Sequence, residues 1–209
     1  MSTRILLVAR HGQATQGPDH VWTPDDPLTA LGHRQAADLA VHVAGLRRRP
    51  TRIVASPFLR AQETAAPCAE ALGLAVETDP RLAEFASTLP SPWTLAETDE
   101  LMPYDAIWHP GDAGWDGETI GSFFERTGAA AEDHARADEV ALVVCHAGTT
   151  IGIIRWAMMI PPNEPDAFDL FIANASLTEI RTRIDRHGRE RRHLRRVGDV
   201  RYLNEVTGI

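Results

Sequence analysis

The 209-residue chain has no lysine, only two cysteines and no apolar run long enough to span a membrane. All 21 of its basic side chains are therefore arginine, against 29 acidic ones. The resulting formal charge of −8 argues against a general nucleic-acid binder. The amino terminus lacks a charged stretch followed by a long apolar segment, so we expect a soluble, cytoplasmic protein without a membrane partner.

The two cysteines, Cys68 and Cys145, lie far apart in the sequence, and each stands in an apolar setting. This pattern favours two buried free thiols. No cysteine pair or close cysteine and histidine cluster occurs, which argues against a zinc site. Hydrophobic residues make up 44% of the chain and charged residues 24%, as in ordinary globular proteins. We therefore expect one domain over residues 1–209.

Short apolar runs alternate with helical patterns, which indicates an α/β fold with a mostly parallel sheet. The apolar runs predict strands at residues 5–9, 52–55 and 140–145. The helical patterns and their capping residues predict helices at about 29–46, 56–72, 118–136 and 149–158. In this interpretation Thr29 caps the first helix, Ser56 caps the second and Gly73 ends the second.

Two other segments do not follow this alternation. From about residue 79 to residue 117 the pattern breaks down among prolines and tryptophans, which is typical of a lid or insertion over a pocket. A packed surface excursion is the alternative.

Residues 177–184 and 189–197 predict a hairpin, and residues 181–196 carry eight arginines against two acids. A charged sheet edge that prevents aggregation is the favoured explanation, and an acidic partner is the alternative.

A histidine stands just beyond the end of two of the apolar strands. Arg10 and His11 follow the first, and His146 follows the run at 140–145. Ligands of an open parallel sheet bind beyond the carboxyl ends of the strands, where Arg60 is also expected. Two guanidinium groups and two imidazoles at one edge form a cationic pocket that suits a phosphoryl group.

These residue types also divide the work of phosphoryl transfer. A neutral imidazole can attack phosphorus, while a second one donates hydrogen bonds to the phosphoryl oxygens. The leaving oxygen needs a proton, for which Glu84 is the first candidate and Glu118 the second. The place of Glu118 just before a helix also fits compensation of the helix dipole. The helix expected at Thr149 adds backbone N–H groups to the pocket.

Taken together, these motifs resemble the histidine phosphatase superfamily, also called the phosphoglycerate mutase-like proteins. The matching segments are residues 7–13, 27–36, 56–65, 117–119, 143–148 and 174–177. The resemblance implies a three-layer α/β/α sandwich with a mostly parallel central sheet. It also implies a two-step reaction through a phosphohistidine, without a metal or another cofactor.

Carried over residue by residue, the resemblance assigns a role to each candidate. It implies that His11 is the phosphorylated nucleophile and that Glu84 is the proton donor. It further implies that Arg10, Arg60 and His146 hold the phosphate.

The chain departs from the family pattern in the two loops near the phosphate. Family members often place an asparagine where this chain has Gly17, so Gln13, Thr15 and Gln16 are candidate replacements in substrate binding. The acid phosphatase branch places an aspartate after the second histidine, where this chain has Ala147. Glu84, at the start of the expected lid, therefore remains the candidate acid. Ala147 is a candidate substrate-binding residue.

The family contains both mutases and phosphatases. Mutases resemble one another in a basic, lysine-containing segment after the catalytic glutamate, which this chain lacks. We therefore expect a phosphatase that hydrolyses a small soluble phosphate monoester. A cofactor-dependent phosphoglycerate mutase, a non-catalytic phospholigand-binding protein and a phosphoprotein phosphatase that docks through the arginine-rich hairpin are the alternatives. A homodimer is one option for assembly, and no nucleic-acid partner is expected.

Overall fold

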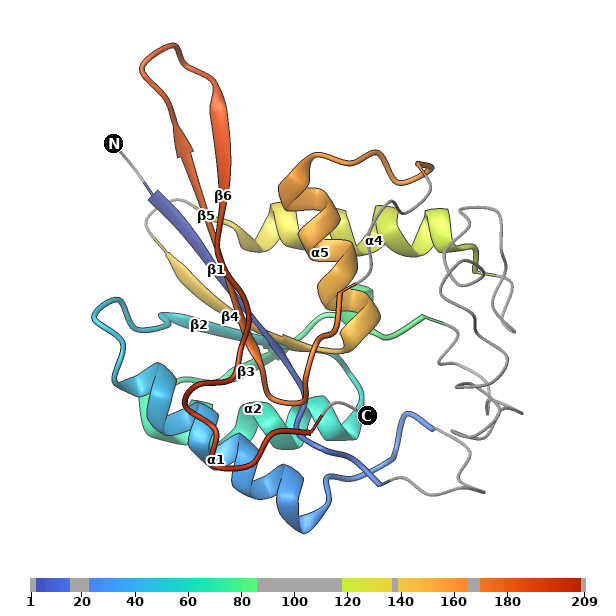
Figure 1. Ribbon diagram of the computed structural model, residues 1–209, viewed down its shortest axis with the longest axis vertical. Coiled ribbons are helices and arrows are strands. Elements are labelled where there is room, and N and C mark those ends of the chain that lie inside the picture. The colour runs from blue at the N-terminus through green and yellow to red at the C-terminus, as the bar shows by residue number, and fades with distance from the viewer. Residues whose placement is uncertain (1–2, 16–22, 86–117, 137–138, 165–169, 208–209) are drawn as a thin grey trace.

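The computed structural model describes residues 3–15, 23–85, 118–136, 139–164 and 170–207 (Figure 1). Its centre is a six-stranded sheet of order β3-β2-β4-β1-β5-β6. The strands are β1 (Thr3–Arg10), β2 (Arg52–Ala55), β3 (Val76–Thr78), β4 (Val140–Cys145), β5 (Leu177–Ile184) and β6 (Glu190–Asp199). The pairs among β1 to β4 are parallel, and β5 and β6 add an antiparallel hairpin. The predicted mostly parallel sheet is confirmed.

Helices cover both faces of the sheet (Figure 1). They are α1 (Ala30–Ala44), α2 (Leu59–Leu72), α4 (Ile120–His134) and α5 (Ala147–Met158), with a short 3₁₀ helix η1 (Pro80–Leu82). Alternate residues of β1 face opposite layers: Ile5 and Leu7 pack with α1 and α2, whereas Leu6 and Val8 pack with α4 and α5. This alternation produces the predicted three layers. None of the described helices combines the length and the apolar character needed to cross a membrane.

Two predicted helix ends are confirmed. Thr29 caps α1, where its side chain accepts a hydrogen bond from the backbone N–H of Gly32. Gly73 ends α2 with a φ of 66°, a left-handed conformation that glycine adopts without strain.

Two predicted helix starts are wrong. The helix α2 begins at Leu59 after Phe58, not at Ser56. The Ser56 hydroxyl accepts a hydrogen bond from the backbone N–H of Phe58, just before the helix, and it also contacts His146. The helix α5 begins at Ala147, directly after His146, and thus two residues before Thr149. Strand β3 is absent from the prediction because three residues are too few for a periodic pattern.

The arginine-rich hairpin lies where it was predicted, and its second strand, β6, is the edge of the sheet. Several of its arginines pair with nearby acids: Arg192 contacts Glu132 and Glu190, and Arg191 contacts Asp185. Most of the predicted lid, residues 86–117, lies outside the described residues, as do Gln16 and Gly17.

Both cysteines are buried and free, as predicted. Burial raises the pKa of the Cys68 thiol to about 12, and burial likewise raises the pKa of Cys145 to about 12. These thiols are therefore packing groups and not thiolate nucleophiles.

The first turn of α1 packs against the loop after β1 with no room for a side chain. A Cβ atom on Gly32 would lie 2.0 Å from the carbonyl oxygen of Gln13, and one on Gly12 would lie 2.5 Å from the carbonyl oxygen of Gly32. Both obstacles are backbone atoms, which cannot move aside as a flexible side chain can. The contact fixes the loop that follows His11 against the helix.

We predict that Gly32→Ala lowers the free energy of unfolding by about 2 kcal/mol or more, because overpacking displaces backbone. The matched control is Gly128→Ala in α4, where the nearest atom to the new Cβ would be 3.6 Å away. That variant should gain up to about 1 kcal/mol from helix propensity. Urea unfolding of both variants measures the difference. A Gly32→Ala protein as stable as the parent would contradict the backbone contact.

Candidate active site

The pairing of β1 with β4 brings two histidines together. Arg10 is opposite Cys145 in the parallel register, so His11 and His146 leave the sheet side by side. Their ring centroids are 5.1 Å apart at an interplanar angle of 62°. Both side chains are buried, with exposed fractions of 4% and 1%.

The third element at this edge is the first turn of α2, which follows β2. It carries Arg60, whose guanidinium lies 4.9 Å from the ring centroid of Phe58, and that ring in turn contacts His146 edge-on. Arg60 Nη1 donates a hydrogen bond of 2.8 Å to the carbonyl oxygen of Thr23. Arg10 Nη1 donates one of 2.6 Å to the carbonyl oxygen of Ile172.

Burial and positive charge keep both imidazoles neutral. Burial lowers the pKa of His11 well below its usual value, and the charges of Arg10 and Arg60 lower it further. Burial and the same two arginines also lower the pKa of His146. Burial lowers the pKa of Arg10 to about 10, so this guanidinium still carries its charge at neutral pH. The site thus combines two neutral imidazoles with two cations.

One hydrogen bond fixes the tautomer of His11. Its Nδ1 lies 2.7 Å from the carbonyl oxygen of Gly12, which can only accept a hydrogen bond. Nδ1 therefore carries the proton, and Nε2 carries the lone pair. The backbone on either side is also held: Gly12 N–H donates to Thr64 Oγ1, and Asn174 Nδ2 donates to the carbonyl oxygen of His11.

His146 is held from its other nitrogen. Its Nε2 lies 2.8 Å from the hydroxyl oxygen of Ser56, at the end of β2. Its Nδ1 is buried and has no hydrogen-bond partner among the described residues. A buried nitrogen in that position is suited to a ligand atom.

In the sequence Glu84 stands two residues after η1. In space its side chain lies against the first turn of α5. Its Oε2 accepts a hydrogen bond of 2.9 Å from Gly148 N–H, and its Oε1 accepts bonds from Thr149 N–H (3.1 Å) and Phe85 N–H (3.0 Å). These two α5 amide groups were expected to face a phosphate, but they bind this carboxylate. The charge of Glu84 also opposes the effect of burial on the pKa of Arg10, so the carboxylate is within electrostatic reach of the pocket.

A family model of the histidine phosphatase superfamily (branch 1) matches residues 6–196. The chain belongs to this superfamily. A Mycobacterium tuberculosis glucosyl-3-phosphoglycerate phosphatase is 36% identical over 122 residues, which cover 53% of this chain and 52% of that protein. A probable phosphoglycerate mutase of Yersinia enterocolitica is 38% identical over 91 residues, 38% of this chain and 37% of that one. The chain spans about half the length, or less, of these curated relatives.

Solved structures of the superfamily match over nearly the whole chain. A mycobacterial glucosyl-3-phosphoglycerate phosphatase in complex with VO3 superimposes with a TM-score of 0.72 at 26% identity, covering 92% of this chain and 98% of that one. A phosphoserine phosphatase from Entamoeba histolytica, in complex with 3-phosphoglyceric acid, gives a TM-score of 0.68 at 21% identity. That match covers 95% of this chain and 98% of the other, and it shows the shared fold.

Two of the predicted loop residues, Gln13 and Thr15, make contacts within the described part of the chain. Gln13 Oε1 accepts a hydrogen bond of 2.8 Å from the Thr29 hydroxyl, and the Thr15 hydroxyl donates one of 3.2 Å to the carbonyl oxygen of Pro27. Ala147 is the first residue of α5 and packs against an apolar cluster. Gln13 and Thr15 thus hold the loop after His11.

Three residues of the site are absent from the predicted set. They are Ser56, which binds His146, and Thr64 and Asn174, which hold the backbone at residues 11 and 12. Ser56 follows β2 just as the two histidines follow their strands, and this shared position is a signal that could have identified it.

We predict that stability falls as the pH is lowered from about 7 to 5. His11 and His146 have lowered pKa values in the folded state, so the unfolded state binds more protons below about 6.5. Each should contribute a slope of up to about 1.4 kcal/mol per pH unit.

Urea unfolding across this pH range measures the slope. In His146→Asn the slope should fall by the contribution of about one proton, because this imidazole no longer titrates. Parallel slopes for the parent and His146→Asn would contradict a buried neutral imidazole.

Proposed function

We propose that this protein is a phosphatase that hydrolyses a small soluble phosphate monoester through a phosphohistidine at His11. The observation that carries the proposal is the pair of buried, neutral imidazoles 5.1 Å apart, flanked by Arg10 and Arg60. The similarity to glucosyl-3-phosphoglycerate phosphatases supports the same reaction class.

In the first step, Nε2 of His11 attacks the phosphorus atom, and the bond from phosphorus to the ester oxygen breaks. The proton on Nδ1, held by the carbonyl oxygen of Gly12, directs the lone pair to Nε2. Arg10 and Arg60 neutralise the charge on the phosphoryl oxygens as the loose transition state forms. Glu84 gives a proton to the leaving oxygen and regains one from the attacking water in the second step.

In the second step, water hydrolyses the phosphohistidine. Glu84, now a carboxylate, takes a proton from the water, whose oxygen bonds to phosphorus as the bond to His11 breaks. Inorganic phosphate leaves, and both residues return to their starting states. His146 assists both steps: donation from the Ser56 hydroxyl to Nε2 places the imidazole proton on Nδ1, which donates to a phosphoryl oxygen.

We further propose a reducing, cytoplasmic location, which the two free thiols support. Assembly as a homodimer stays a prediction, which a measurement of the particle mass in solution would test.

The first test is His11→Ala. We predict a loss of phosphatase activity of at least about 10³-fold, because the other imidazole of the described site, His146, binds Ser56 through Nε2 and would donate to the phosphoryl group from Nδ1. Release of inorganic phosphate from a panel of phosphate esters measures it, and circular dichroism shows whether the fold survives. Hydrolysis near the parent rate in a folded variant would remove His11 from the nucleophile role.

The second test is Glu84→Gln. We predict that kcat/KM for an alkyl phosphate falls by about 10²- to 10⁴-fold, because an alkoxide is a poor leaving group that needs the proton. The value for p-nitrophenyl phosphate should fall much less, since nitrophenolate leaves without protonation. Equal losses on the two substrates would argue against Glu84 as the acid.

A product analysis separates the phosphatase from its alternatives. With 3-phosphoglycerate, formation of 2-phosphoglycerate without net phosphate release would show a mutase. Tight binding of phosphate without turnover of any ester would show a binding protein.

A further inference from the structure

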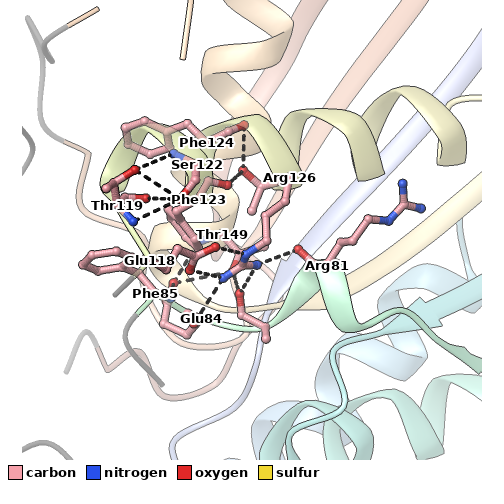
Figure 2. A network of polar contacts seen from close by, with 12 residues as sticks. Arg81, Glu84, Phe85, Glu118, Thr119, Ser122, Phe123, Phe124, Arg126 and Thr149 are labelled. Carbon is pink, nitrogen blue, oxygen red and sulfur yellow. Dashed lines mark hydrogen bonds and ion pairs between the residues drawn. The ribbon is translucent and has the colours of Figure 1, made fainter. Parts of the chain in front are cut away.

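The guanidinium of Arg126 joins α4 to the segment that carries Glu84 (Figure 2). Its Nη1 donates hydrogen bonds of 2.8 Å to the carbonyl oxygens of Arg81 and Ala83, and its Nη2 lies 3.5 Å from that of Glu84. The segment leaves η1 at this point, where carbonyl groups no longer have partners within the helix. Arg126 supplies those partners from a neighbouring element.

The guanidinium is itself held in place on two more sides. Glu118 pairs with it at both oxygens, with distances of 2.5 Å from Nε to Oε1 and 2.8 Å from Nη2 to Oε2. The ring of Phe123 lies 4.7 Å from the guanidinium carbon. The side chains of Arg126 and Glu118 are only 22% and 18% exposed. A bidentate, largely buried ion pair fixes the plane of the Arg126 guanidinium as well as its position.

Two helices therefore grip Glu84 in different ways. Helix α4, through Arg126, holds the backbone just before and at this residue. In α5 the amide groups of Gly148 and Thr149 hold its carboxylate, and the Thr149 hydroxyl also donates to the carbonyl oxygen of Ala83. A proton donor must stay within hydrogen-bond reach of the leaving oxygen, and a displacement of about 1 Å can cost about 10²-fold in rate.

We propose that Arg126, oriented by Glu118, is a positioning residue that holds the proton donor Glu84 against the start of α5. The inference rests on the proposed role of Glu84. It also gives Glu118 a function other than the two considered from the sequence: its carboxylate binds Arg126 and is neither the acid nor only a compensating charge at a helix end.

A second effect of Arg126 has to be separated from positioning. The pKa of His146 is lowered first by burial and then by Arg60, His11 and Arg10. The charge of Arg126 makes a further, smaller contribution in the same direction. A purely electrostatic role would need only the charge. Arg126→Lys keeps that charge but cannot bridge two carbonyl groups and a carboxylate at once, so it distinguishes the two roles.

The experiment compares kcat/KM for an alkyl phosphate and for p-nitrophenyl phosphate. For Arg126→Met we expect a loss of about 10²-fold on the alkyl ester and a several-fold smaller loss on the nitrophenyl ester, because only the former needs the donor. Arg126→Lys should show the same selectivity. In the Glu84→Gln background, Arg126→Met should add no further selective loss, because the donor is already absent.

The matched control is Arg155→Met in α5. Arg155 also stacks on a phenylalanine, at 4.3 Å from the ring centroid of Phe124, and donates from Nη2 to the carbonyl oxygens of Pro161 and Glu164. Its loss should leave the ratio of the two kcat/KM values unchanged. Should Arg126→Met fail to fold, Glu118→Gln, which keeps the arginine, should give the same selective loss at smaller size.

The outcomes separate this inference from the function on which it rests. Selective loss in Glu84→Gln with equal losses in Arg126→Met, or full recovery in Arg126→Lys, would overturn the positioning role alone. Equal losses in Glu84→Gln would overturn the acid assignment and the positioning role with it. A shift in the ratio for Arg155→Met as large as that for Arg126→Met would show that the loss of any buried arginine produces the effect.

Discussion

The parallel pairing of β1 with β4 is the constraint on which the site depends. It places Arg10 opposite Cys145, so that the next residue of each strand is a histidine at the same edge of the sheet. Both rings are buried, and burial is tolerated because both are neutral. A shift of the register by one residue would turn one ring into the layer of helices and leave the other alone.

The protein's own acidic groups offset only part of the positive charge at this edge, and an anionic ligand would offset more of it. Two guanidinium groups approach the imidazoles, and burial lowers the pKa of both Arg10 and Arg60. The charge of Glu84 offsets part of this cost in each case. A phosphoryl dianion would offset more of it, because its oxygens accept from both arginines at short range. The cost of burying these cations in the free protein thus favours binding of a phosphate ester.

The sequence was informative where local pattern decides structure. The buried run at 52–55, the strand at 140–145 and the hairpin that turns near Gly188 coincide with the observed elements, because apolar runs and turn residues act over short distances. The places of His11, Arg10, Arg60 and His146 at the ends of predicted strands located them before the family resemblance assigned their roles, and the structure brings them to one edge of the sheet.

The remaining details depend on side-chain contacts that local pattern does not reveal. Ser56 has the sequence of a helix cap, but its hydroxyl binds His146, 90 residues later. Glu118 stands before a helix as a dipole-compensating acid would, but its partner Arg126 is two turns into that helix. No periodic pattern encodes either of these contacts.

The two halves of the proposed chemistry have different structural origins. The groups that would hold the phosphoryl group come from strand ends and from the first turn of α2, whose positions the sheet fixes directly. Glu84 comes from an irregular segment after η1, and without a ladder of strand hydrogen bonds it needs contacts from α4 and α5 to hold one position. The leaving group of the ester must lie on the Glu84 side of the phosphorus. In the proposed reaction, attack by His11 is therefore common to all esters, whereas proton donation by Glu84 distinguishes them by their leaving groups.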